Sequence, residues 1–287
     1  MKKYDKKVII AVAPAARHGD EKAERIGDNT PLVSVMTPEE IANDVINCAK
    51  EGASVIHMHV RDENGHLTDD LTQFRRTLGL IKASCDVIIE GSTGGVSELN
   101  AEQRGGVLNV QEVELAALNM GSVNLGGAAF VNEPNDIALW ASLIVEKGKL
   151  PILECFEPGM IQNVENLLDE GVLRNPVIYG IPMGFDGTQP AKVVNMQGML
   201  NVMPRDAVWY YQQHGMKDLS MIAAAVAAGA QIVRVGFEDS IYYAPNCVAR
   251  TNAELVSEAA KVIRAIGYQV ATVDEAREII GLRGVSA

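Results

Sequence analysis

Residues 54–60 read Ser-Val-Ile-His-Met-His-Val, a nearly unbroken apolar run that contains two histidines. Apolar runs without polar alternation are typical of strands buried on both faces of a parallel sheet. A helical pattern precedes this run from Pro38 to Glu51, and another follows it from Leu71 to Ala83. This order of strand and helix predicts a parallel sheet covered by helices.

The same alternation extends over the whole chain. Eight apolar runs predict strands at Val8–Pro14, Ser54–Val60, Val87–Ser92, Leu115–Leu125, Leu150–Phe156, Pro176–Met183, Ala207–Gln212 and Ile232–Phe237. Further helical patterns lie at Asn135–Lys147, Met160–Gly171, Ala191–Met203, Leu219–Ala228, Ala253–Ile266 and Val273–Ile280. We therefore expect an α/β fold, a (β/α)8 TIM barrel that forms a single domain over residues 1–287.

An open doubly wound sheet is the alternative fold. Such sheets usually carry a glycine-rich turn after the first strand, but here that turn reads Pro14-Ala15-Ala16-Arg17. The longest irregular stretch is His18–Met36, and loops of that length are usually functional. We expect an active-site loop near residues 18–36.

Threonines mark the starts of three predicted helices. Thr37 is followed by Pro38 at the first helical position and by Glu40 at the third, which is a capping box. Thr251 and Thr272 begin the same pattern.

Composition excludes several classes of protein. The 287 residues carry 25 Lys+Arg against 37 Asp+Glu, and a net charge of -12 argues against nucleic-acid binding. No apolar stretch reaches the roughly 18 residues of a membrane helix, and the N-terminus lacks the features of a signal peptide. The four cysteines are widely spaced without a CxxC pair, which argues against a zinc knuckle or redox pair. We expect a cytoplasmic protein with reduced thiols.

The two histidines of the second strand are the first candidates for chemistry. Side chains two apart on a strand share a face, so His57 and His59 point together into the barrel mouth. They either bind one metal ion or are two hydrogen-bonded core histidines, and we favour metal because buried polar rings need partners.

The third ligand is expected from the last strand. Arg234, Gly236 and Glu238 alternate there onto one face, and layers in such barrels come from alternate strands. His57, His59 and Glu238 can thus share a layer, and two histidines with one carboxylate form a catalytic type of zinc shell that Fe²⁺ would also accept. The alternative for Glu238 and Asp239 is a helix cap or a surface pair, but Arg234 on the same face needs a carboxylate partner.

Other strand ends carry polar residues that fit a substrate site. Ser92-Thr93-Gly94-Gly95 follows Glu90 on the third strand, and such turns expose amides that cradle anions. Ser122 and Asn124 end the fourth strand region, and Glu154 ends the fifth. Each of these is also consistent with ordinary polarity at a strand end.

In order along the chain, these motifs resemble those of the β-keto acid cleavage enzyme family, and especially its members that cleave 3-keto-5-aminohexanoate in lysine fermentation. The resemblance covers almost the whole chain. It rests on Thr37–Ala42, His57–Asp62, Ser92–Gly95, Gly121–Asn124 and Val233–Asp239. The His-x-His-x-Arg-Asp and Arg-Val-Gly-x-Glu-Asp motifs are the specific part.

The resemblance implies a zinc enzyme that converts a β-keto acid and acetyl-CoA into acetoacetate and an acyl-CoA. It implies that His57, His59 and Glu238 bind zinc and that Asp239, positioned by Arg234, is the base that removes the C2 proton. The implied substrate-binding residues are Ser92, Thr93, Gly95, Ser122, Asn124 and Glu154. It also implies a homo-oligomer, with a tetramer suspected.

The sequence departs from the family at one position. Arg17 stands where the amino-substrate enzyme carries a glutamate that recognises the substrate's ammonium group. A cation at that position disfavours an amine and favours a neutral or anionic β-keto acid. If Arg17 points outward instead, Glu90 is the carboxylate that would restore a preference for the amine.

Two other functions compete with this interpretation. A metal-dependent hydrolase of the amidohydrolase type is also a barrel with a His-x-His strand, but that family places the pair on strand 1 and adds histidines on strands 5 and 6. A metal-stabilised small-molecule binding protein is the non-enzymatic alternative.

Overall fold

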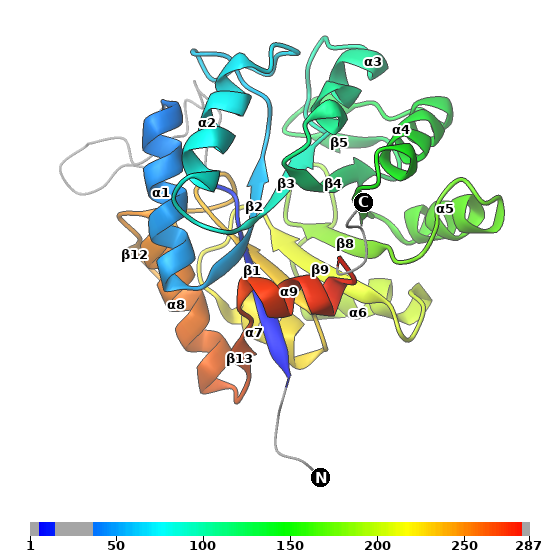
Figure 1. Ribbon diagram of the computed structural model, residues 1–287. Helices are drawn as coiled ribbons and strands as arrows, with labels where there is room; N and C mark the ends of the chain where they lie inside the picture. The colour runs from blue at the N-terminus through cyan, green and yellow to red at the C-terminus, as the bar shows by residue number, and fades with distance from the viewer. Residues whose placement is uncertain (1–5, 15–36, 283–287) are drawn as a thin grey trace.

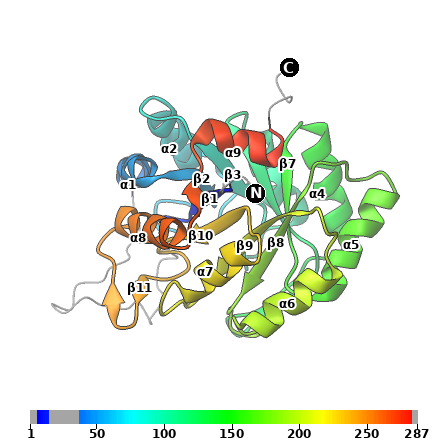
Figure 2. The same cartoon turned by 90° about the horizontal axis from the view of Figure 1, so that it is seen from below.

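Eight parallel strands close into a barrel in the computed structural model, which describes residues 6–14 and 37–282. Each strand pairs with the next along the chain, and β10 pairs with β1 (Figures 1 and 2). The barrel strands are β1 (Lys7–Val12), β2 (Ala53–Met58), β3 (Ile88–Ser92), β4 (Val113–Asn119), β7 (Leu150–Glu154), β8 (Ile178–Met183), β9 (Val208–Gln213) and β10 (Ile232–Val235). The predicted TIM barrel is confirmed, and the open sheet is wrong because β10 closes onto β1.

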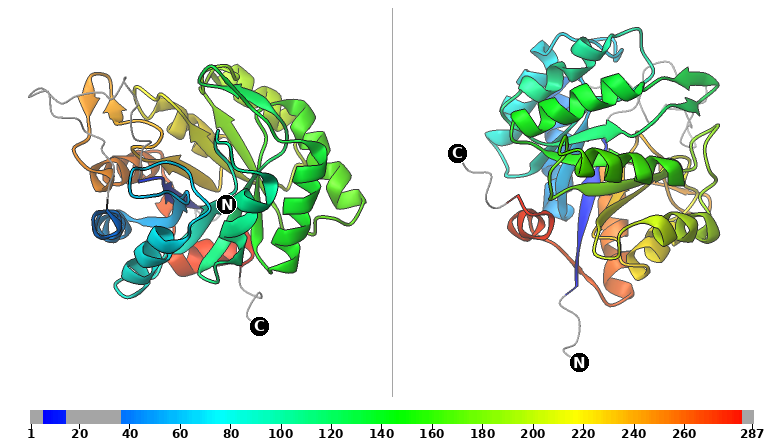
Figure 3. Two further views of the ribbon diagram at one scale, coloured as in Figure 1. Left: turned by 90° about the horizontal axis from the view of Figure 1, so that it is seen from above. Right: turned by 90° about the vertical axis from the view of Figure 1, so that its right-hand side faces the viewer.

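Helices surround the barrel (Figure 3). They are α1 (Pro38–Glu51), α2 (Thr72–Lys82), α3 (Ala101–Arg104), α4 (Pro134–Glu146), α5 (Pro158–Asp169), α6 (Val193–Val202), α7 (Ser220–Ala227), α8 (Asn252–Ala265) and α9 (Val273–Ile280). The predicted bounds of α1 and α9 match. The connection from β3 to β4 holds only α3 and the 3-10 turn Gly105–Asn109, and no helix was predicted there. Among the described residues, none of the helices has the length and apolarity to cross a membrane.

Three threonines begin helices as the sequence predicted. Thr37 and Thr272 each form a complete capping box with the glutamate three positions later. Thr251 accepts a hydrogen bond from the Glu254 amide, but the Glu254 carboxylate accepts from the Arg250 amide and not from the cap amide.

The predicted fourth strand, Leu115–Leu125, is too long. Strand β4 ends at Asn119, and the chain then forms an antiparallel hairpin of β5 (Val123–Leu125) and β6 (Ala128–Phe130). The turn consists of Gly126 and Gly127, whose φ angles of 59° and 84° suit a two-residue hairpin turn. A second hairpin, β11 (Tyr242–Ala244) with β12 (Cys247–Val248), follows β10.

The barrel interior is apolar at the N-terminal end of the strands. Ile9, Val55, Ile88 and Ile232 meet there in a buried cluster, which α9 covers with residues such as Ile280. Strand β13 (Gln269–Val270) pairs with the start of β1 and directs α9 across this end (Figure 1). The N-terminal end of the barrel is thus filled and capped, which leaves the C-terminal end for a site.

Successive interior layers change from apolar to charged toward the C-terminal ends. Residues two positions further along share the same face of a strand. His57 therefore lies above Val55, Glu90 above Ile88, Glu154 above Ile152 and Arg234 above Ile232, and all four polar side chains are buried.

The chain turns sharply after β10, at Gly236. Its φ of 145° is one that side chains rarely adopt, and a Cβ atom there would lie 2.2 Å from the Ala13 carbonyl oxygen. The Asp239 amide donates to the Gly236 oxygen at 2.9 Å, and the Glu238 amide donates to the Ala13 oxygen at 3.2 Å. This turn therefore fastens the residues after β10 to the end of β1.

We predict that Gly236→Ala lowers the free energy of unfolding by about 1–3 kcal/mol or more. A side chain at this φ is strained, and its Cβ atom would collide with the backbone of Ala13. Urea unfolding measures the change. The control is Gly79→Ala on α2, where a Cβ meets nothing within 4 Å. That variant should gain roughly 0.5–1 kcal/mol from helix propensity. Wild-type stability in Gly236→Ala would show that the turn relaxes freely.

Candidate active site

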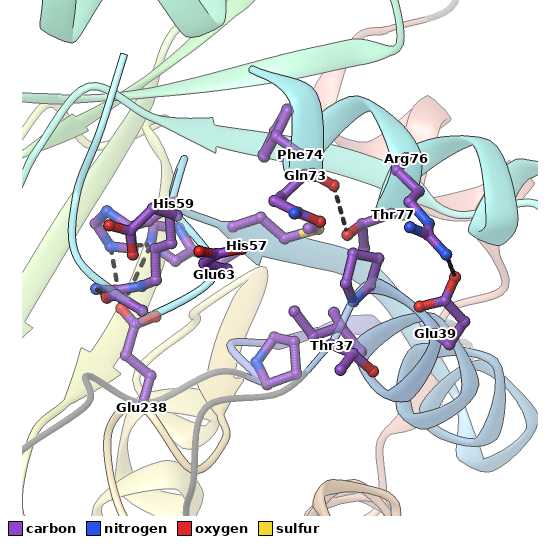
Figure 4. Close-up of a pocket in the computed structure, with 17 residues that line it drawn as sticks. Thr37, Glu39, His57, His59, Glu63, Gln73, Phe74, Arg76, Thr77 and Glu238 are labelled. Carbon is purple, nitrogen blue, oxygen red and sulfur yellow. Dashed lines mark hydrogen bonds and ion pairs between the residues drawn. The ribbon is translucent and has the colours of Figure 1, made fainter. Parts of the chain in front are cut away.

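His57, His59 and Glu238 meet at the C-terminal end of the barrel (Figure 4). The two Nε2 atoms of the histidines are 3.3 Å apart. Oε1 of Glu238 lies 3.2 Å from Nε2 of His59 and 3.6 Å from Nε2 of His57. All three potential ligand atoms lie within 4.8 Å of one another, so one ion can reach them together.

The hydrogen bonding of His57 fits a metal ligand. Nδ1 of His57 donates to Oε1 of Glu90 at 2.7 Å, and both side chains are almost fully buried. With its proton on Nδ1, the neutral ring aims the Nε2 lone pair at His59 and Glu238. Lone pairs and a carboxylate that converge in this way need a cation between them. The residues present therefore fit a divalent metal, with His57, His59 and Glu238 as its protein ligands.

The charges of the surrounding layer also fit a cation. Four carboxylates are grouped near the Arg234 guanidinium in this part of the described barrel, and they belong to Glu90, Glu154, Glu238 and Asp239. Buried carboxylates are costly unless positive charge offsets them. One guanidinium offsets only part of this charge, and a divalent ion would offset most of the remainder.

The pKa values of the three potential ligands are shifted by burial and by their charged neighbours. Burial raises the pKa of the Glu238 carboxyl, but His59, His57 and Arg234 together outweigh burial and hold that pKa well below its usual range. Burial lowers the pKa of both histidines. At His57 the carboxylates of Glu90 and Glu238 together outweigh burial and the pKa is raised, whereas at His59 burial prevails and the pKa is lowered.

Arg234 and Asp239 form a buried bidentate ion pair beside the metal ligands. Nε and Nη2 of Arg234 donate to the two oxygens of Asp239 at 2.7 and 2.6 Å, and each residue is 3% exposed. Nη2 also lies 3.6 Å from Oε1 of Glu238. The guanidinium thus separates two adjacent carboxylates.

The structure corrects the reason for this arrangement. The sequence predicted that Arg234, Gly236 and Glu238 alternate along one strand, but β10 ends at Val235. Glu238 reaches His59 because the chain turns at Gly236, as described above. The residues meet as expected, but the alternation is wrong.

The Ser92–Gly95 turn lies beside His59. A small cavity there is lined by His59, Ser92, Thr93 and Gly94 among others. Ser92 Oγ accepts from the Gly94 amide at 3.1 Å, whereas Thr93 Oγ1 donates to the Ala117 oxygen and ties the turn to β4. Gly95 has a φ of 120°, and a Cβ there would lie 2.4 Å from Leu67 Cδ1, so this position requires glycine.

Ser122 and Asn124 belong to the exposed β5–β6 hairpin. Ser122 Oγ donates to the backbone carbonyl oxygen of Asn132 at 3.1 Å and accepts from the backbone N–H of Asn132 at 2.8 Å. These two hydrogen bonds join the two ends of the hairpin. A Cβ atom at Gly187, which follows β8, would lie 2.7 Å from the backbone oxygen of Asn124. Their expected part in substrate binding stays a prediction.

Glu154 is buried at the end of β7. Its Oε1 accepts from Gln212 Nε2 at 2.8 Å, across β8, where Gly180 leaves room by having no side chain. Burial raises the pKa of the Glu154 carboxyl. Gln212, which lies near the end of a predicted strand, was not among the expected site residues.

Glu90 has a different place from the one that the sequence suggested. It was considered as a carboxylate for a substrate amine, but it is 0% exposed and bonded to His57, with the Tyr210 hydroxyl 3.4 Å from its other oxygen. Its Oε1 is thus engaged by His57, and its suggested part in recognising a substrate amine stays a prediction. The signal in the sequence was a glutamate within an apolar strand, but its partner depends on the register that places Glu90 beside His57. Arg17 and the loop expected at residues 18–36 lie outside the described residues.

A family model described as beta-keto acid cleavage enzyme matches residues 7–282 of this chain. The 3-keto-5-aminohexanoate cleavage enzyme of Fusobacterium nucleatum subsp. nucleatum is 34% identical over 265 residues, which cover 91% of this chain and 95% of that protein. This chain belongs to the β-keto acid cleavage enzyme family. It is therefore an enzyme. The interpretations as an amidohydrolase-type hydrolase and as a binding protein without activity are both wrong.

Two further comparisons concern the sequence and the fold. The 3,5-dioxohexanoate:acetyl-CoA acetone transferase of Paraburkholderia graminis is 29% identical over 311 residues, covering 98% of this chain and 97% of that protein. Among solved structures, ObcA in a ternary complex with a C4-CoA adduct and oxalate has a TM-score of 0.73 at 18% identity, covering 88% of this chain and 68% of that one. The second likeness supports the barrel fold.

We predict that Glu90 sets the metal affinity of the site through His57. Replacing such a supporting carboxylate typically weakens metal binding about 10- to 100-fold. Glu90→Leu should show this loss in a competition titration with a zinc chelator. Glu90→Gln keeps an oxygen that can accept from Nδ1 and should lose less.

The control is Glu154→Gln, which changes a carboxylate in the same layer that is not bonded to a histidine. It should lose less zinc affinity than Glu90→Leu, because it removes charge from the layer but no hydrogen bond to a ligand. Equal zinc affinity in Glu90→Leu and the wild type would remove Glu90 from the metal site.

Proposed function

We propose that this member of the family is a zinc-dependent enzyme that transfers an acyl group between a β-keto acid and CoA, with acetyl-CoA as co-substrate. The reaction is β-keto acid + acetyl-CoA → acetoacetate + acyl-CoA. The observation that carries the proposal is the convergence of His57, His59 and Glu238 beside the Arg234–Asp239 pair. The acetyl-CoA transferase name of the Paraburkholderia relative supports the co-substrate.

A zinc ion held by these three residues would act as a Lewis acid on the substrate's keto oxygen, which acidifies the hydrogens at C2. Iron(II) would accept the same ligands but is the less favoured metal. Asp239 accepts a C2 proton, and its pairing with Arg234 keeps it off the metal. A carboxylate that stays off the metal retains the lone pair that a base needs.

The loss of that proton makes C2 a nucleophile toward the acetyl thioester. A C–C bond forms from C2 to the acetyl carbonyl carbon and the C–S bond breaks, which releases the CoA thiolate. The thiolate then adds to the original keto carbon, and the bond from that carbon to C2 breaks. The products are an acyl-CoA and acetoacetate, whose C2 regains a proton.

The remaining expected residues are proposed to hold the substrate. The Ser92 hydroxyl accepts from the Gly94 amide, so its proton is left to donate to the substrate carboxylate. Thr93 and Gly95 shape that turn. Ser122, Asn124 and Glu154 are proposed to contact the other reacting groups.

The proposed substrate is 3-keto-5-aminohexanoate or a related β-keto acid. Arg17, where the amino-substrate enzyme has glutamate, favours a neutral or anionic relative. That the enzyme is a cytoplasmic homo-oligomer stays a prediction. An assay of several β-keto acids with acetyl-CoA, in which acetoacetate is measured, tests the function, and a panel without any acetoacetate would refute it.

We predict that His59→Ala loses most of its bound zinc and keeps its fold. Removing one of three protein ligands leaves an incomplete shell. Elemental analysis should find about one zinc per wild-type chain and far less in the variant, with unchanged circular dichroism. His66→Ala is the control, because that imidazole is 64% exposed on a turn. Full zinc retention in His59→Ala would contradict the ligand set.

We predict that Asp239→Asn keeps zinc but loses exchange of the substrate's C2 hydrogens with deuterated water. An amide does not accept the proton, and general-base catalysis typically contributes about 10²–10⁴-fold. NMR of the β-keto acid follows the exchange without acetyl-CoA. Exchange at the wild-type rate would assign the base elsewhere, and Asp62 is the next candidate.

A further inference from the structure

A cavity of about 450 Å³ begins at the proposed metal ligands and extends between α1 and α2. His57, His59 and Glu238 line one end (Figure 4). Arg76 and Glu39, which form an ion pair, lie at the other end. Because all three ligand residues line this cavity, a group bound to the metal has direct access to it.

The walls between these ends include an apolar part. Ile41 comes from α1, Met58 from the end of β2 and Phe74 from α2, with Pro14 and Pro38 beside them. Met58 is 7% and Phe74 is 3% exposed, so this part of the wall belongs to the folded core. Such a surface favours the burial of alkyl groups. The uncharged polar residues of the lining are Thr37, Gln73 and Thr77.

The charged residues of the cavity are already engaged or solvated. Glu39 is paired with Arg76, and the Asp62 carboxylate accepts from the amides of Asn64 and His66. Arg61 donates to the Gly65 oxygen, and Glu63 is exposed. Three carboxylates against two guanidiniums make a poor environment for the phosphates of CoA.

The position of His59 gives the direction of a bound β-keto acid. His59 lines this cavity and also the small cavity at Ser92 and Thr93. A substrate with its carboxylate at the Ser92 turn and its keto oxygen at the metal would direct the substituent on its keto carbon into the larger cavity.

We propose that the cavity between α1 and α2 holds this substituent and selects an uncharged alkyl chain longer than ethyl, with Ile41 limiting its length. This inference rests on the proposed function and adds the class of its substrate. Wild-type enzyme should therefore prefer 3-oxohexanoate and 3-oxooctanoate to 3-oxopentanoate, and should prefer 3-oxohexanoate to 3-keto-5-aminohexanoate.

Two substitutions of Ile41 change the cavity in opposite directions. Ile41→Phe narrows it and should lower kcat/KM for 3-oxooctanoate by about 10-fold or more, while 3-oxopentanoate changes little. Ile41→Ala widens it and should shift the preference toward longer chains. The matched control is Asn43→Phe, which adds the same ring to an exposed position of α1 and should leave the chain-length preference unchanged.

A binding measurement separates this inference from the proposed reaction. 2,2-Dimethyl-3-oxooctanoate lacks C2 hydrogens and cannot be activated by the base. Calorimetry with the zinc-loaded protein should show that this compound binds more tightly than 2,2-dimethyl-3-oxopentanoate. The Ile41→Phe variant should bind the two compounds with similar affinity. If acetoacetate never forms but this pattern holds, the reaction is wrong and the cavity assignment stands.

Two results would overturn the inference. One is an Ile41→Phe enzyme that changes only the KM for acetyl-CoA, which would assign the cavity to the thiol arm of that co-substrate. The other is a clear wild-type preference for 3-keto-5-aminohexanoate over 3-oxohexanoate, which would require a free carboxylate in the substituent's path.

Discussion

The site depends on a layer of buried charge placed directly on an apolar layer of the barrel. Because side chains repeat every two residues, the strands that pack Val55, Ile88 and Ile232 against α9 must present His57, Glu90 and Arg234 one layer higher. The apolar layer excludes water from below, so charges in the upper layer interact strongly with one another. Each charge therefore needs a partner, and those partners define the site.

The four carboxylates of this layer differ in their partners. Glu238 faces two imidazoles, Asp239 is held by both arms of Arg234, and Glu90 is bonded to His57. Glu154 accepts a hydrogen bond from the side-chain amide of Gln212, and burial raises its pKa. Similar groups in different environments can take different parts in one reaction. Carboxylates with such different partners suit a reaction in which one carboxylate binds a metal and another accepts and returns a proton.

Local patterns in the sequence were enough to predict the barrel, most helices to within two residues and the pairing of the two histidines. The apolar runs and the threonine caps are signals within a few residues, and the structure agrees with them. The β5–β6 hairpin was missed because the apolar pattern continues through Gly121 and only the two glycines at 126 and 127 mark the turn. The position of Glu238 was expected for the wrong reason, since a positive φ at Gly236 is not visible in an alternating pattern.

The contacts that were missed join residues far apart in the sequence. Glu90 is 33 residues from His57, and Gln212 is 58 residues from Glu154. Whether a strand carboxylate faces a substrate or a histidine depends on the register between strands, and here His57 and Glu90 are direct neighbours across β2 and β3. A one-residue shift in register would turn Glu90 out of the interior and leave Nδ1 of His57 without its acceptor. The register of two strands, which packing of their apolar residues fixes, therefore determines which nitrogen of His57 is free to bind a metal.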